Sequence, residues 1–77
     1  MTDEQRLYMG IYRTYLVVQR DHTLPPKLHA QVVEFIHGNL IEAGRAWRAA
    51  GATNTDILDA RSKIWGMMQR ESLPTTE

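Results

Sequence analysis

The chain has 77 residues, no cysteine, and a formal net charge of zero made of nine basic and nine acidic side chains. A domain of this length buries only about 60% of its unfolded surface, and without cysteine neither disulfides nor a thiolate metal site can reinforce its core. The balanced charge argues against a protein whose main task is to grip nucleic-acid backbone, because such proteins usually carry a basic excess.

The hydropathy pattern places the whole chain, residues 1–77, in one helical domain outside any membrane. No apolar run approaches the length of a membrane span. Asp3 and Glu4 stand where a signal peptide would be basic. We therefore expect a soluble, cytoplasmic protein in which residues 74–77 form a disordered tail.

The first predicted helix covers about residues 2–20, with Thr2 as its N-cap. Its apolar residues fall at helical spacing on two stripes rather than one, which indicates two packing partners. The first stripe is Tyr8, Ile11, Tyr15 and Val18, and the second is Met9, Tyr12 and Leu16.

The second predicted helix, about residues 25–50, is the longest element, and its stretch from Lys27 to Ala50 alone would be roughly 36 Å long. Thr23 is its expected N-cap, and the two prolines at 25–26 suit a first turn. Its apolar stripe passes Gly38-Asn39 without a change of phase, which favours one helix, bent or straight there, over two. Gly51 is the expected C-cap. The stripe consists of His29, Val33, Ile36, Leu40, Ala43, Trp47 and Ala50.

The third predicted helix covers about residues 55–71 and stops before Pro74. Its apolar arc is wider than a single neighbouring helix would bury. The predicted fold is therefore an all-α, small three-helix bundle with a long central helix. The arc contains Ile57, Leu58, Ala60, Ile64, Trp65, Met67 and Met68.

We expect this bundle to form a homodimer. The long helix can cover only one stripe of the first helix, so Met9, Tyr12 and Leu16 would otherwise remain in water. Each large apolar side chain contributes about 1.5–3 kcal/mol when buried, and a domain this small has little stability to spare. A two-fold contact between first helices would bury the stripe.

No combination of residues specifies a catalytic, cofactor or metal site. Glu34 and His37 lie one helical turn apart, but di-iron proteins that use this spacing need a second such pair and two further glutamates. Ser62 follows Asp59 by one turn but has no histidine in its helix, and the chain lacks a glycine-rich phosphate loop. We expect a protein that is not an enzyme and needs no cofactor or metal.

The expected function is to bind another protein, and so to regulate, inhibit or scaffold it, through an aromatic and methionine-bearing helical surface. Tyrosine and tryptophan suit such surfaces because the ring buries apolar surface while its O–H or N–H group stays in contact with water. A line of arginines on the first helix could make charged contacts to an acidic partner. The alternative is that these arginines form only a solvated face of the helix. The interface candidates are Tyr8, Met9, Tyr12, Tyr15, Leu16, Trp65 and Met68, and the arginines are Arg6, Arg13 and Arg20.

Two other functions stay open at this point. Residues 50–53 resemble the turn of a helix-turn-helix DNA-binding unit. Against it, Trp47 stands where the two helices would be closest, and Asp56 and Asp59 would face phosphates. The second alternative is a sensor that holds a small ligand between helices near Trp47 and Trp65.

Overall fold

The computed structural model describes residues 2–72, and these form three helices and no strand. The predicted all-α, three-helix class is confirmed. The predicted helical ranges differ from the observed bounds by one residue at most, and the predicted tail at 74–77 lies outside the described residues. The helices are α1 (Asp3–Arg20), α2 (Pro26–Ala49) and α3 (Asn54–Ser72).

Short polar motifs fix the helix ends. The Thr2 hydroxyl accepts a hydrogen bond from the Gln5 backbone N–H at the start of α1 (3.1 Å). At α3, the Thr53 hydroxyl accepts from the Asp56 N–H and the Asp56 carboxylate accepts from the Thr53 N–H, which is a reciprocal capping box. The C-cap residue of α2 is Ala50, and Gly51, the predicted cap, follows it with φ of 110°, the left-handed conformation in which helices commonly end.

The start of α2 differs from the prediction, because Thr23 does not cap it. The Thr23 N–H and hydroxyl both donate to the Asp21 carboxylate (2.8 and 2.6 Å), and Pro25 precedes the helix without a side-chain cap. The hydroxyl bond, followed by the backbone bond, lowers the pKa of Asp21. Because the pKa of Asp21 is lower in the folded chain than in the unfolded chain, this turn stabilises the fold at neutral pH. That stabilisation is lost as the pH falls through the pKa of Asp21 in the folded chain.

The long helix continues through Gly38-Asn39 without a break. The Asn39 side-chain amide donates to the backbone carbonyl of Phe35 (3.2 Å), within the preceding turn, rather than starting a new helix. The single-helix alternative is therefore the one that the structure adopts.

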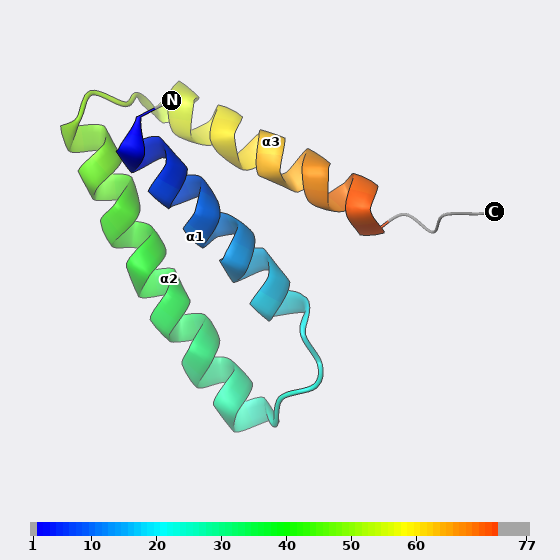
Figure 1. Ribbon diagram of the computed structural model, residues 1–77. Coiled ribbons are helices and arrows are strands. Elements are labelled where there is room, and N and C mark those ends of the chain that lie inside the picture. The colour runs from blue at the N-terminus through cyan, green and yellow to red at the C-terminus, as the bar shows by residue number, and fades with distance from the viewer. Residues whose placement is uncertain (1, 73–77) are drawn as a thin grey trace.

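α1, and not the long helix, lies at the centre of the arrangement. α1 and α2 form an antiparallel hairpin, and α3 returns along the other side of α1 (Figure 1). The molecule measures 40 × 36 × 17 Å. The molecule is therefore flattened, with two broad faces, and all three helices meet in one buried cluster. The prediction of a centrally placed long helix is wrong in this respect.

The core lies where the start of α1, the end of α2 and the start of α3 converge (Figure 1). Trp47, predicted to be in the core, is only 6% exposed. At the other end of the hairpin, the half-buried His29 ring lies 2.8 Å, through Nε2, from the Val18 carbonyl. The buried residues of the convergence are Tyr8, Leu40, Ala43, Trp47, Ile57 and Ala60.

The second stripe of α1 is covered inside the chain. Leu16 is 7% exposed and packs with Ile64 and Met68 of α3, while Met9 and Tyr12 pack against the same cluster. The premise that this stripe needs a second copy of the chain is therefore wrong. Ile64 and Met68 of the third helix cover the second stripe of the first helix, whereas Leu58, Trp65 and Met67 of the same apolar arc remain exposed.

Candidate functional site

Tyr8 is the residue around which the three helices meet. It is 2% exposed, and its ring lies 5.6 Å from the Trp47 ring and stacks at 6.4 Å on Tyr12. Gly44 of α2 lies against this ring, since a Cβ at that position would be in van der Waals contact with Tyr8 Cε1 at 3.4 Å. The buried hydroxyl is satisfied by Arg61 of α3, whose Nε donates to it at 2.6 Å.

Arg61 is thereby held at the surface above two tyrosine rings. Its guanidinium carbon lies 5.6 Å from the Tyr12 ring centre and 6.0 Å from that of Tyr8, within cation–π range. Because the bond to Tyr8 uses only Nε, the two terminal NH2 groups of the guanidinium remain for another acceptor. The core tyrosine thus positions a surface cation.

Two adjacent surface depressions, each of about 300 Å³, share Arg61. One lies between α2 and α3 and the other between α1 and α3. Together with the Tyr15 ring, which lies 5.7 Å from the His37 ring, their exposed and half-buried side chains form one surface that we name the aromatic–arginine face. Its members are Tyr12, Tyr15, His37, Ile41, Arg45, Arg48, Leu58, Arg61 and Trp65.

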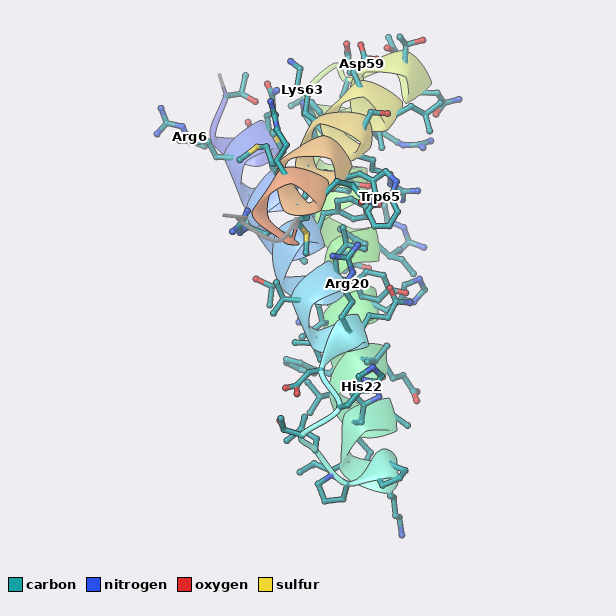
Figure 2. The ribbon with its side chains drawn as sticks, turned by 90° about the vertical axis from the view of Figure 1, so that its right-hand side faces the viewer. Arg6, Arg20, His22, Asp59, Lys63 and Trp65 are labelled. Atoms are coloured by element: carbon teal, nitrogen blue, oxygen red, sulfur yellow. The ribbon has the colours of Figure 1, made fainter. Side chains whose placement is uncertain are left out.

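Trp65 is the most prominent aromatic group on this face. It is 46% exposed, and the Arg20 guanidinium carbon lies 4.9 Å from its ring centre. Figure 2 shows Trp65 and Arg20 next to each other on one side of the molecule, with Arg6 and Lys63 on the opposite side. The cation–π contact restricts the tryptophan ring while leaving much of it in water.

The structure divides the interface candidates predicted from the sequence. It buries Tyr8, Leu16 and Met68 inside the chain, so their side chains are not available to a partner in this conformation. Met9 is half-buried at the contact between α1 and α3. The remaining candidates, Tyr12, Tyr15 and Trp65, lie together on the aromatic–arginine face.

The line of arginines on α1 does not act as a unit. Arg20 joins Trp65, Arg6 lies on the opposite side (Figure 2), and Arg13 is half-buried. Sequence reasoning missed Arg48 and Arg61. No local signal marks them, because Arg61 meets Tyr8 across 53 positions of sequence.

The geometry does not assemble the other sites considered from the sequence. Trp47 is in the core and Trp65 lines the depression between α1 and α3, so the two do not enclose one ligand. Glu34 and His37 are both exposed. Among the described residues, no group of three or more His, Asp or Glu side chains could hold a metal ion.

No protein-family model matches this chain, and neither a curated protein nor a solved structure shows significant similarity to it. Within residues 2–72, no helix combines the length and the hydropathy needed to cross a bilayer.

Proposed function

We propose that this chain is a non-catalytic protein-binding module whose partner docks on the aromatic–arginine face. The observation that carries the proposal is the clustering of exposed Trp65 and Leu58 of α3 with Ile41 of α2 around the fixed Arg61. Tryptophan, tyrosine and arginine dominate the binding energy of protein interfaces. Apolar side chains gathered in this way on a surface mark interaction sites.

The fixed positions of the charged groups favour binding. Arg61 is held by Tyr8 and Arg20 lies against Trp65. A side chain ordered before binding loses less conformational entropy on association than a freely rotating one, which costs about 0.5–1.5 kcal/mol to immobilise. A module of this kind would regulate, inhibit or scaffold its partner by occupying part of the partner's surface.

Affinity capture from the native host, with quantitative mass spectrometry, tests the proposal. Trp65→Ala is expected to reduce recovery of the specific partner about tenfold or more, because a central tryptophan anchor is commonly worth at least about 2 kcal/mol. Lys63→Ala, on the same helix but on the opposite side (Figure 2), is the matched control and should recover the partner as the wild type does. Equal recovery by both variants, at equal thermal stability, would contradict the proposal.

We also propose that the chain forms a homodimer through the other broad face. A shallow groove there is mainly apolar, and its one charged lining residue is Arg6. Phe35, 72% exposed, lies beside the groove with Glu34 and Glu42 around it. A two-fold contact would place each Phe35 in the partner's groove and the carboxylates near Arg6. The groove is lined by Arg6, Leu7, Gly10, Ile11, Thr14, Ile36 and Asn39.

Light scattering after size exclusion is expected to give twice the chain mass of 8.9 kDa at micromolar concentration. Phe35→Ser should shift the species to monomer with little loss of monomer stability, since the side chain is exposed. Met67→Ser, which removes an exposed apolar side chain from α3, is the control and should leave the dimer intact. A wild-type monomer at all concentrations would refute the dimer.

A further inference from the structure

The charged side chains that line the two depressions of the aromatic–arginine face are all positive, although the chain is neutral overall. Among the described residues, neither depression has an aspartate or glutamate in its lining, whereas acidic side chains line surfaces elsewhere: Asp56 and Asp59 beside Lys63, and Glu34 and Glu42 around Phe35. The neutral total charge therefore conceals a local excess of positive charge. The positively charged residues of the two depressions are Arg45, Arg48 and Arg61.

This charge is little neutralised by the chain itself. Arg61 donates to a tyrosine hydroxyl rather than to a carboxylate, and within the described residues the Arg48 side chain has neither a hydrogen bond nor an ion pair. Arg45 contacts Glu42 at 3.1 Å, but both side chains are about 70% exposed. Exposed pairs of this kind are weak and are exchanged readily for another carboxylate.

We infer that the aromatic–arginine face takes an acidic, partly apolar peptide segment of the partner protein; this inference rests on the proposed function. Partner carboxylates would bind Arg48 and the free NH2 groups of Arg61, where charge-assisted hydrogen bonds form. An apolar partner side chain would occupy the depression between α1 and α3, against Leu58 and Trp65.

The same features favour a peptide over a nucleic acid. The phosphates of a nucleic-acid duplex would satisfy the arginines, but its paired and stacked bases supply no apolar group to the depression lined by Tyr12, Leu16, Leu58 and Trp65. A peptide segment supplies both carboxylates and apolar side chains. The zero net charge of the chain also gives a polyanion little long-range attraction.

The test is an NMR titration of the isotope-labelled full chain with a synthetic peptide of Glu, Leu and Phe. The peptide with every Glu replaced by Gln and a duplex oligonucleotide are the comparison ligands. The acidic peptide is expected to perturb the signals of Arg48, Leu58, Arg61 and Trp65 and to bind more weakly as salt is raised. Arg48→Glu should weaken its affinity about tenfold or more. Lys63→Glu, an exposed charge reversal on the opposite side, should not weaken it.

Equal affinity for the Glu and Gln peptides would overturn the inference, because the face would then recognise apolar groups alone. Oligonucleotide binding at the same residues with a steeper salt dependence would also overturn it and identify a nucleic-acid site. If a captured partner docks through a neutral or basic segment, the proposed function stands and the acidic preference is wrong. If the acidic peptide binds but no partner depends on Trp65, the proposed function fails while the charge preference of the face stands.

Discussion

Trp47→Ala is expected to lower the free energy of unfolding by about 3–5 kcal/mol, the usual loss when a large aromatic core side chain is truncated. Trp47 is 6% exposed and contacts Tyr8, which itself joins all three helices. The truncation would leave a cavity at the convergence of the helices. For a chain of 77 residues the expected stability is about 4–12 kcal/mol, so this loss is a large fraction of it.

Chemical denaturation followed by circular dichroism measures this loss, and the second tryptophan provides a matched control. Trp65→Ala removes the same atoms from a side chain that is 46% exposed and has a cation–π contact with Arg20. Its expected cost is about 1 kcal/mol or less. Equal losses for the two variants would mean that Trp47 is not in the core and that the phase of α2 is wrong.

Leu16→Glu is expected to release α3 from α1. Leu16 is enclosed by Ile64 and Met68. Replacing it with Glu removes apolar contacts worth about 2–5 kcal/mol and would bury an unpaired carboxylate. Because α3 is joined to the rest mainly through α1, the chain can avoid the buried charge by detaching that helix. Partner binding should then be lost together with the aromatic–arginine face.

Native-state hydrogen exchange resolves this outcome by helix. The amides of α3 should lose protection while those of α1 and α2 in the hairpin retain most of theirs. Val17→Glu, at the adjacent and exposed position, is the control and should change stability by about 0.5 kcal/mol or less. If Leu16→Glu instead preserves the protection of α3 and only halves the mass of the particle, the stripe is a contact between chains.

Local structure was predictable from the sequence because its causes are local. The Thr2 hydroxyl accepts a backbone hydrogen bond at the start of α1, and Gly51 adopts a positive φ after the end of α2. The unbroken period of the apolar stripe correctly predicted that α2 continues through Gly38-Asn39. The prediction that Thr23 caps α2 was wrong for an equally local reason. A hydroxyl two residues from an aspartate can bind that carboxylate instead of a helix N-terminus.

Which helix covers which stripe was not predictable in the same way. The stripe containing Leu16 shows that a partner is needed but does not distinguish a second copy of the chain from α3. The aromatic–arginine face was not predictable for the same reason. Arg61 becomes significant only when folding brings it to the Tyr8 hydroxyl, and no pattern of spacing anticipates a contact between residues so distant in sequence.

Site-specific photo-crosslinking in the native host shows directly whether the partner docks on the aromatic–arginine face. A photoreactive amino acid placed at 65 should crosslink to one partner protein through a single segment of it. The same amino acid at 63, on the opposite side of α3 (Figure 2), should not. Crosslinks to that partner from position 63 and none from position 65 would contradict docking on this face.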